Sequence, residues 1–383
     1  MDKQIQVYVL DMVEEFECMG GDCPYTCCKG WQVCIDEDTL KLYRGNHGLE
    51  GIISYGVCKS NNGTTVLRKI CGRCPFHTFK GLCGLQLRGK KDYMPLVCRM
   101  YPRCSFVYGD RQEVTLELSC YRAAQRFVEN AMNTDVEHMA EWLEFKPSEK
   151  EYPVEWELND PDSGFIDFLL GIREDINHFL YEEEGNVTPK IKCILEYTHK
   201  LHSLVSQDKI DKAREVRIEE TVGDSNYALF PVRLMNEHIY GVLEDSKISF
   251  REPLLYKIIK KYRKLFGKLW EYEADDFLNS RVAEMLEKNP DIERLIFAYF
   301  GYNINQSLMV AAEDYYLLKP VVMSAVMTQF LIIFVLTDYL SGEVLDNDRL
   351  AAVISNMEKG IAHNPFIMDT ILKSVNELWF EGA

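Results

Sequence analysis

The sequence predicts an α+β protein that is predominantly α, in which a small cysteine-rich metal-binding module with short strands packs on a mostly helical body. Three observations lead to this prediction. Twelve of the 13 cysteines fall in the first 120 of 383 residues, short alternating segments lie in the same region, and longer segments with helical periodicity follow it. The hydrophobic content of 47% is that of a folded globular chain and excludes disorder as the main state.

Composition divides the chain near residue 122. Residues 1–122 carry 16 basic and 14 acidic side chains, whereas residues 123–383 carry 27 and 46, so the net charge of −17 belongs to the second part. We therefore expect a cysteine-rich module over 1–122 and a helical body over 123–383, with a possible linker at 147–164, which is polar and holds three prolines. An acidic chain repels phosphate backbones, so we expect no nucleic-acid partner.

Within the module, residues 4–10 and 113–118 alternate polar and apolar side chains, a pattern typical of half-buried strands. Turn-rich residues such as 59–65 lie between them and cannot supply a large core. A module of this kind usually needs a metal or crosslinks for stability, so ligation is expected on stability grounds alone.

Beyond the module, apolar residues recur at intervals of three and four over 120–145, 165–180 and 254–270, which predicts helices. The most apolar run is 320–336, and it includes Ser324, Thr328 and Gln329. Its 17 residues fall short of the roughly 20 that a spanning helix needs. We expect a buried core helix here and no membrane span.

The N-terminus lacks the basic start and apolar core of a secretory signal, so a cytoplasmic location is expected. In a chain that is not exported, dense cysteines are more often metal ligands or catalytic thiols than disulfides.

The first cysteine cluster places Cys18, Cys23, Cys27 and Cys28 within eleven residues, with glycines between them that let the backbone curl around one centre. Thiolates are soft donors that suit iron–sulfur clusters or zinc. Because the neighbouring side chains of Cys27 and Cys28 diverge, they rarely ligate one ion together. They could serve two centres, or one could be a spare thiol.

The second cluster contains Cys71, Cys74, Cys83, Cys98, Cys104 and Cys120. The two clusters together strongly indicate a metal, but they say less about which metal. Zinc usually takes four ligands in compact pairs, whereas these are spread over about 100 residues. His47 and His77 are isolated and are expected to be surface or structural residues. The alternative is a set of small hydrophobic cysteines in a reduced interior.

At this point the motifs resemble those of a known family. They are Phe16-x-Cys18-x-Gly20-x-x-Cys23-x-x-x-Cys27-Cys28-x-Gly30-Trp31, Ile35-Asp36, Cys74-Pro75-Phe76, Gly81-Leu82-Cys83-x-Leu85-Gln86, Cys98-x-x-Tyr101-Pro102-Arg103 and Leu116-x-Leu118-Ser119-Cys120, with Ile361-Ala362-His363-Asn364 far downstream. This pattern resembles the bacterial flagellin lysine-N-methylases, the FliB-type family. The likeness covers most of the chain and is specific in residues 1–122.

The resemblance implies methyl transfer from S-adenosylmethionine to lysine side chains of flagellin by an enzyme that contains an iron–sulfur cluster, expected to be [4Fe–4S]. The family's eight recurring thiols fall on Cys18, Cys23, Cys27, Cys28, Cys74, Cys83, Cys98 and Cys120. They could hold two four-iron clusters, or one cluster beside a structural zinc or unligated thiols. Five cysteines go beyond the pattern: Cys34, Cys58, Cys71, Cys104 and Cys193.

The methyl-donor site is not visible in the sequence. There is no GxGxxG signature of a Rossmann-type methyltransferase, and Cys23-x3-Cys27 is followed by Gly30 where a radical S-adenosylmethionine enzyme would have its third thiol.

Transfer to an amine requires a neutral, aligned lysine, a group that accepts its proton, and excluded water. The residues beside the cysteine motifs that could serve as catalytic groups are Asp36, Tyr93, Tyr101 and Arg103. In the alternative reading Tyr101-Pro102-Arg103 only braces the thiol loop, and His363 is expected to be structural.

Two other functions remain open at this stage. The chain could be a non-catalytic zinc- or iron-chelating or redox module. It could also be a cluster-dependent enzyme of the same family that acts on another peptide or small molecule, because function depends on sites rather than on folds.

Overall fold

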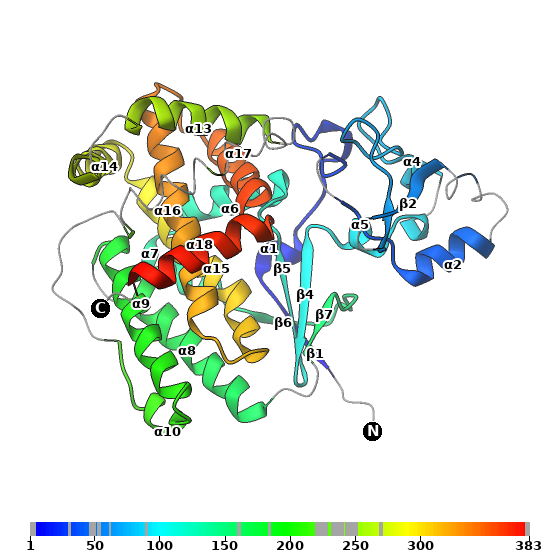
Figure 1. Ribbon diagram of the computed structural model, residues 1–383. Helices are drawn as coiled ribbons and strands as arrows, with labels where there is room; N and C mark the ends of the chain where they lie inside the picture. The colour runs from blue at the N-terminus through cyan, green and yellow to red at the C-terminus, as the bar shows by residue number, and fades with distance from the viewer. Residues whose placement is uncertain are drawn as a thin grey trace.

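The computed structural model describes residues 5–29, 32–45, 51, 55–60, 63–88, 91–158, 162–182, 185–218, 229–230, 241, 252–267 and 271–379. Their arrangement is mainly helical with a small mixed sheet, as the sequence predicted (Figure 1). Gly30, Trp31 and His47 lie outside the described residues.

The strands are β1 (Gln6–Val9), β2 (Val57–Lys59), β3 (Thr65–Leu67), β4 (Arg103–Tyr108), β5 (Arg111–Leu116), β6 (Lys146–Ser148) and β7 (Trp156–Glu157). The short helices are α1 (Asp11–Glu14), η1 (Gly20–Asp22), α2 (Glu37–Gly45), α4 (Gly84–Leu87), η2 (Lys91–Tyr93), α5 (Leu96–Met100), α7 (Val136–Trp142), α10 (Ile210–Ala213), η3 (Leu308–Ala312) and the π-helical turn η4 (Glu358–Ala362). The longer helices are α6 (Tyr121–Asn133), α8 (Ser163–Tyr181), α9 (Val187–Val205), α13 (Pro253–Phe266), α14 (Glu271–Lys288), α15 (Asp291–Ser307), α16 (Leu318–Leu340), α17 (Asn347–Met357) and α18 (Pro365–Trp379).

The main sheet has the order β6-β1-β5-β4-β7. Strands β4 and β5 form an antiparallel hairpin that turns at Gly109, whose positive φ of 62° suits a tight turn. Strand β1 runs parallel to β5. The predicted strands at 4–10 and 113–118 are therefore present as β1 and β5. In Figure 1 the sheet lies between the helical body and the cysteine-rich part of the chain.

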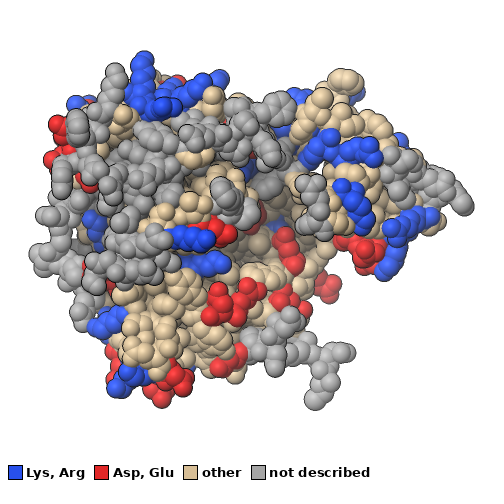
Figure 2. Space-filling model, in the orientation of Figure 1, with Lys and Arg blue, Asp and Glu red and all other residues tan. Residues whose placement is uncertain are grey.

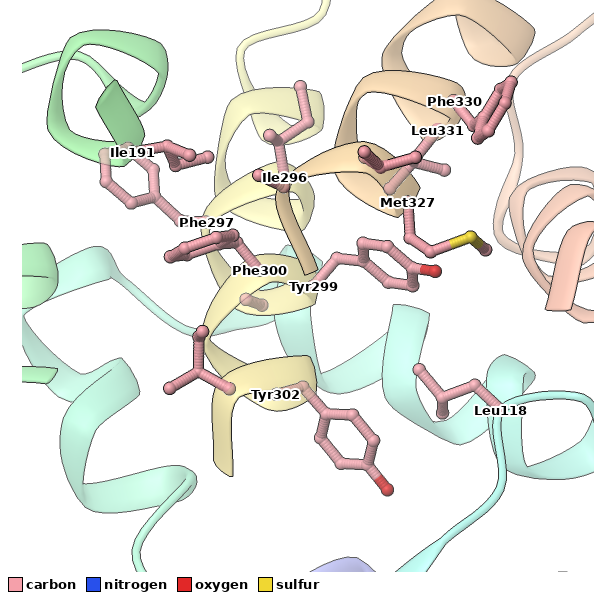
Figure 3. Packing of buried hydrophobic residues seen from close by; sticks show 14 of the residues in the cluster. Leu118, Ile191, Ile296, Phe297, Tyr299, Phe300, Tyr302, Met327, Phe330 and Leu331 are labelled. Atoms are coloured by element: carbon pink, nitrogen blue, oxygen red, sulfur yellow. The ribbon is translucent and has the colours of Figure 1, made fainter. Parts of the chain in front are cut away.

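The main core joins the sheet to the helices. Figure 3 shows α15 at its centre, with Phe297, Tyr299 and Phe300 between α9 and α16. Val9, Val13 and Phe16 from the N-terminal region belong to the same buried cluster. Residues 146–148 and 156–157, at the expected linker, are strands of the main sheet. Whether residues 1–122 and 123–383 fold as separate domains stays a prediction.

Helix α16 is the one helix in the described ranges that is long and apolar enough to span a membrane by length and composition. Within the structure, 94% of its most apolar window is buried, in line with the core helix expected at 320–336. Helix α16 is buried on all sides because it packs against α9, α13, α14, α15 and α17.

The cysteine-rich region has a second, much smaller core. It consists of Ile35, Leu40, Tyr43, Leu67, Cys74 and Leu85, which come from α2, the β2–β3 hairpin and the loops around α4. So few buried side chains supply little hydrophobic stabilisation.

Candidate metal centre

Two glycines allow the loops that carry the cysteines to touch. A Cβ atom on Gly21 would lie 2.5 Å from the carbonyl oxygen of Lys80, and one on Gly81 would lie 2.7 Å from that of Gly21. Gly81 also has a positive φ of 74°. Only glycine permits this approach without a shift of the backbone, which brings the loop of Cys23 against the loop of Cys83.

Backbone hydrogen bonds join the remaining cysteine loops. The N–H of Cys74 donates to the carbonyl of Cys28 at 2.8 Å, and an antiparallel bridge joins Lys29 to Arg73. A second bridge pairs His77 with Cys83. The chain is therefore folded so that Cys28, Cys74 and Cys83 come from three adjacent loops.

Several thiols accept hydrogen bonds from nearby backbone N–H groups. The donor to Cys18 is Gly20, at 3.4 Å from the sulfur atom. Further donors, each two or three residues C-terminal to its cysteine, are Tyr25 for Cys23, Phe76 for Cys74, Leu85 and Gln86 for Cys83, and Arg122 and Ala123 for Cys120. Such donors favour the thiolate, which is the form that binds metal.

Cys28 lies close enough to Cys74, Cys83 and Cys98 to raise the pKa of all three. Burial raises the pKa of Cys98 to about 12, with further contributions from Cys74, Cys28 and Cys83. Burial likewise raises the pKa of Cys74 to about 11, again with contributions from Cys28 and Cys83. We call Cys28, Cys74, Cys83 and Cys98 the second thiol group.

The other four thiols gather around the start of α6. Burial raises the pKa of Cys120 to about 11, and Cys23 and Cys18 add to the rise. Cys27 donates a hydrogen bond to Cys28, which raises the pKa of Cys27 and lowers that of Cys28. Cys28, then Cys98 and then Cys120 act on Cys27, so this thiol lies between the two groups, and we count it with Cys18, Cys23 and Cys120 in the first thiol group.

These groups fit a thiolate-bound metal in donor type and in the hydrogen bonds that the thiols accept. Neighbouring thiols that oppose one another's ionisation can lose their protons together only when a cation compensates the charge. No three or more His, Cys, Asp or Glu side chains in the described ranges are grouped around a point that one ion could occupy, which for zinc lies about 2.3 Å from each sulfur. No disulfide joins any of the 13 cysteines, all of which lie within the described residues.

The five additional cysteines occupy different surroundings. Cys34 and Cys71 are exposed, Cys58 lies on β2, and Cys193 is buried in α9. Cys104, on β4, is hydrogen-bonded to the carboxylates of Glu117 and Glu155, and its pKa is raised by burial first and by both carboxylates.

Two of the predicted catalytic residues hold parts of the module together. The Asp36 carboxylate accepts hydrogen bonds from the backbone of Leu96 at 2.7 Å and of Thr39 at 2.9 Å. Burial opposes ionisation of Asp36, but these donors outweigh it and lower its pKa. Arg103 donates to the carbonyls of Val13 and Phe16 at 3.3 and 3.2 Å.

The other two are placed nearer the thiols or the small core. The Tyr101 hydroxyl lies 3.1 Å from that of Ser119, and burial, with Cys120 and Cys27, raises the Tyr101 pKa well above 10. Tyr93 packs against the small core, and its carbonyl accepts a hydrogen bond from Tyr43. The contacts of these four residues point in different directions, so their catalytic roles stay a prediction.

Two basic side chains face the second thiol group without a partner among the described residues. They are Lys69, through Nζ, and His77, through Nε2, and both atoms are buried. In the sequence His77 is isolated from other metal-ligating histidines, and Lys69 belongs to none of the cysteine motifs. Contacts between the loops place both side chains beside the thiols, and the spacing of residues in the sequence does not predict this.

An acid–histidine network adjoins the first thiol group. His363 Nε2 lies 3.0 Å from a carboxylate oxygen of Glu117, whose backbone carbonyl accepts from the N–H of Cys120. Glu358 accepts a hydrogen bond from Tyr299, and burial raises the Glu358 pKa to about 7. Glu117 and His363 remain 24% and 31% exposed, so solvent reaches one end of the network.

Apart from His363, this network could not be predicted from the sequence. Glu117 follows β5, whereas Glu358 and His363 lie in and just after η4, more than 200 residues later in the chain. A single acid, Glu358, within an otherwise apolar helical pattern was the available signal. Figure 2 shows acidic side chains gathered between the helical body and the cysteine-rich end, where the surface is hollowed. The arrangement can bind a cation and exchange protons near neutral pH.

The chain is similar to flagellar and methylase proteins. It is 27% identical over 133 residues to the flagellar biosynthetic protein FliU of Salmonella muenchen, which covers 33% of this chain and 79% of that protein. It is also 27% identical over 133 residues to lysine-N-methylases of Salmonella typhimurium strain LT2 and Salmonella choleraesuis strain SC-B67. The match spans 33% of the length of these two enzymes.

These similarities agree with the resemblance to the FliB-type family, but they cover a third of the chain rather than most of it. No protein-family model matches the chain. No solved structure matches it either.

Proposed function

We propose that this protein is a cytoplasmic iron–sulfur enzyme that transfers methyl groups from S-adenosylmethionine to lysine side chains of flagellin. The observation that supports the proposal is that the loops carrying the eight family-pattern thiols fold together, so that the thiols affect one another's pKa. The relatives named lysine-N-methylase and flagellar biosynthetic protein support the reaction and the substrate.

The cysteines of the two groups are the residues that would hold the iron. A bound iron–sulfur cluster would supply a fixed charged group beside which the methyl donor could be oriented. The chain contributes the thiolates, the backbone N–H groups that stabilise them, and the glycine contacts that keep the loops together.

The lysine amine attacks the methyl group only after it has lost its proton, so an acceptor must lie near the first thiol group. The Glu117 carboxylate is partly exposed and could bind the ammonium group. Glu358 lies behind it, and with a pKa raised to about 7 by burial it exchanges a proton at neutral pH. In this proposal the network orients the amine and takes up its proton.

The metal is tested by anaerobic purification followed by iron, sulfide and zinc analysis. We expect iron and sulfide in the wild-type protein and at least a twofold loss of iron in Cys74→Ser and in Cys120→Ser. Cys34→Ser is the matched control because Cys34 is exposed and lies outside both thiol groups, and it should keep the wild-type content. A colourless protein with stoichiometric zinc contradicts the cluster.

The reaction is tested by incubating iron-loaded protein with S-adenosylmethionine and flagellin and measuring intact mass. Each transfer adds about 14 Da to a lysine. We expect His363→Gln to lower the rate at least tenfold without loss of iron, because the glutamine no longer pairs with Glu117 as a cation. If iron-loaded wild-type protein never modifies flagellin, the proposed activity is wrong.

A non-catalytic metal module is the second candidate, and the contacts of Asp36 and Arg103 favour it. Both side chains are taken up by hydrogen bonds that brace loops, as a purely structural role would require. Metal binding with no methyl transfer to flagellin or to other lysine-containing peptides would support this candidate.

A further inference from the structure

The amine of Lys69 is buried and has no hydrogen-bond partner in the part of the chain that the structure describes. Lys69 follows β3 and precedes Cys74 by five residues. Burial lowers its pKa, whereas Cys74, Cys28 and Cys98 of the second thiol group, and after them Cys27, oppose this effect. Lys69 therefore interacts most strongly with three of the four thiols in the second group, and also with Cys27, which lies between the groups.

His77 approaches the same thiols from another side. Its Nε2 atom is buried and also has no hydrogen-bond partner among the described residues. Its backbone N–H donates to the carbonyl of Cys74 at 3.1 Å, and its bridge to Cys83 fixes its position. After the hydrogen bond from Cys27 and that from Thr26, His77 and Lys69 contribute to the lowered pKa of Cys28.

An unpaired buried ammonium group is costly, and native structures rarely keep one. The cost disappears if the cavity beside it holds an anion. Four thiolates contribute four negative charges, so an iron–sulfur cluster that they bind is anionic overall unless its iron–sulfide core carries at least four positive charges. Such a group would supply the missing partner of both side chains.

The first thiol group has different surroundings. Lys359 is the basic residue that lowers the pKa of Cys23 after the backbone donor Tyr25, and its Nζ already donates to the carbonyl of Tyr25 at 3.2 Å. The carboxylate of Glu117 lies on the same side, three residues before Cys120. Among the described residues, the basic side chains without a hydrogen-bond partner, Lys69 and His77, therefore lie at the second group, whereas the carboxylate of Glu117 lies beside the first.

We propose that Lys69 and His77 donate hydrogen bonds to an anionic iron–sulfur group held by Cys28, Cys74, Cys83 and Cys98, and that this group accepts an electron more readily than one held by the first thiol group. The inference rests on the proposed iron–sulfur content. Reduction adds one electron and one negative charge to the group, with no bond made or broken in the chain. Donors to the sulfur atoms and nearby positive charge raise a cluster's reduction potential.

The test compares anaerobically purified full-length wild-type protein with Lys69→Met, which keeps the length of the side chain but removes its charge. Iron and sulfide are measured first, and the potentials are then determined by titration with dithionite, which supplies the electron, followed by electron paramagnetic resonance. Lys80→Met is the matched control because Lys80 is exposed in the same module. Lys69→Arg keeps the charge.

We expect two potentials in the wild-type protein. Lys69→Met should lower one of them by at least a tenfold change in the reduction equilibrium, about 59 mV for a one-electron couple, and leave the other unchanged. His77→Leu should shift the same potential in the same direction. Lys69→Arg and Lys80→Met should behave as the wild type does.

Unchanged potentials in Lys69→Met, or equal shifts of both, would overturn the inference. If Lys69→Met loses iron, retention of iron and of both potentials by Lys69→Arg supports a role for the charge, whereas loss from both variants shows a packing role and overturns it. A wild-type protein without iron contradicts the proposed cofactor itself. If the wild-type protein contains iron and transfers methyl groups, but the substitution at Lys69 leaves both reduction potentials unchanged, only this inference is contradicted and the proposed function stands.

Discussion

Glu358 shows how one residue can couple the core to solution pH. Its carboxyl group is buried among the helices and accepts a hydrogen bond from Tyr299. Burial disfavours the charged form and raises the pKa from 4.5 to about 7, and the Tyr299 hydrogen bond opposes that rise only in part. The folded protein therefore binds the Glu358 proton more tightly than the unfolded chain does.

The sign of the pH dependence follows from this difference. The stabilisation is fully present below pH 4.5 and is lost as the pH rises through about 7. We expect this group to lower the free energy of unfolding by on the order of 3 kcal/mol over that interval. In Glu358→Gln, which cannot ionise, this part of the dependence should disappear, as measured by urea unfolding from pH 4.5 to 8.

The exposed Glu313 provides the control, and Glu313→Gln should follow the wild-type profile. If Glu358→Gln and the wild type lose stability in parallel as the pH rises, the carboxyl group is not protonated in the folded protein at neutral pH.

At the scale of elements, strand β5 is held to the helices by buried polar contacts. Arg173 of α8 donates to both carboxylate oxygens of Glu113 on β5, at 2.7 and 2.8 Å. The hydroxyl of Tyr302 on α15 accepts from the N–H of Leu116 at 3.0 Å. These contacts fix how the sheet sits against α8 and α15, and hence where β5 delivers Glu117 and Cys120.

Removing one partner of this buried ion pair should cost more than the pair contributes, because the remaining charge is left in the core. We expect Arg173→Met to lower the free energy of unfolding by about 3 kcal/mol or more. Glu113 retains Arg111, at 2.7 Å, as a second partner, which keeps the loss from being larger. Urea unfolding followed by circular dichroism measures the effect.

Arg281→Met is the matched control, because Arg281 pairs with Glu284 on the surface of α14 and exposed pairs contribute about 1 kcal/mol or less. Adding Glu113→Gln to Arg173→Met should restore part of the loss. Equal stabilities of Arg173→Met and Arg281→Met would show that the buried pair does not hold β5 to α8.

At the scale of the whole molecule, the two cores are very unequal. The main core runs through the sheet and the long helices, whereas the loops between residues 32 and 88 share the small core around Tyr43 and Leu67. A region with so small a core depends on ligation for much of its stability. We therefore expect the stability of the cysteine-rich loops to depend on bound metal, and the stability of the helical body to be independent of it.

Hydrogen exchange with mass spectrometry tests this coupling. After anaerobic removal of metal, exchange should rise at least tenfold in residues 32–45, 55–60 and 63–88, which contain the small core. Helices α15 and α16 should keep their protection because the main core buries them. A uniform rise across the chain, or no rise in the cysteine loops, would contradict the division.

Much of the fold was predictable because it depends on local pattern. Alternation identified β1 and β5, intervals of three and four identified α8 and α13, and a continuous apolar run identified α16. The helix expected over 120–145 is instead two helices, α6 and α7, separated at Thr134 and Asp135. Strands β6 and β7 were not recognised because each is so short that its pairing with β1 or β4, rather than its own residues, defines it.

The candidate site was predictable only as a set of residue types. The motifs indicated thiolate ligation, and the resemblance supplied the eight thiols. Asp36 and Arg103 attracted attention because they adjoin these motifs, but in the structure both donate or accept hydrogen bonds that brace the backbone. Glu358 and Lys69 could not be recognised in the same way, since burial and thiol contacts give them their unusual surroundings.

By itself, the sequence determined the class of fold, the concentration of soft donors in the first 120 residues, and the family that the motifs resemble. Only the tertiary structure decided which thiols are neighbours: Cys120 lies near Cys18 and Cys23 across about 100 residues, and Cys27 interacts with Cys98 as well as with Cys120. The physical reason is that periodicity and donor type are local properties. Proximity between loops depends on how the sheet, the glycine contacts and α6 bring distant segments together.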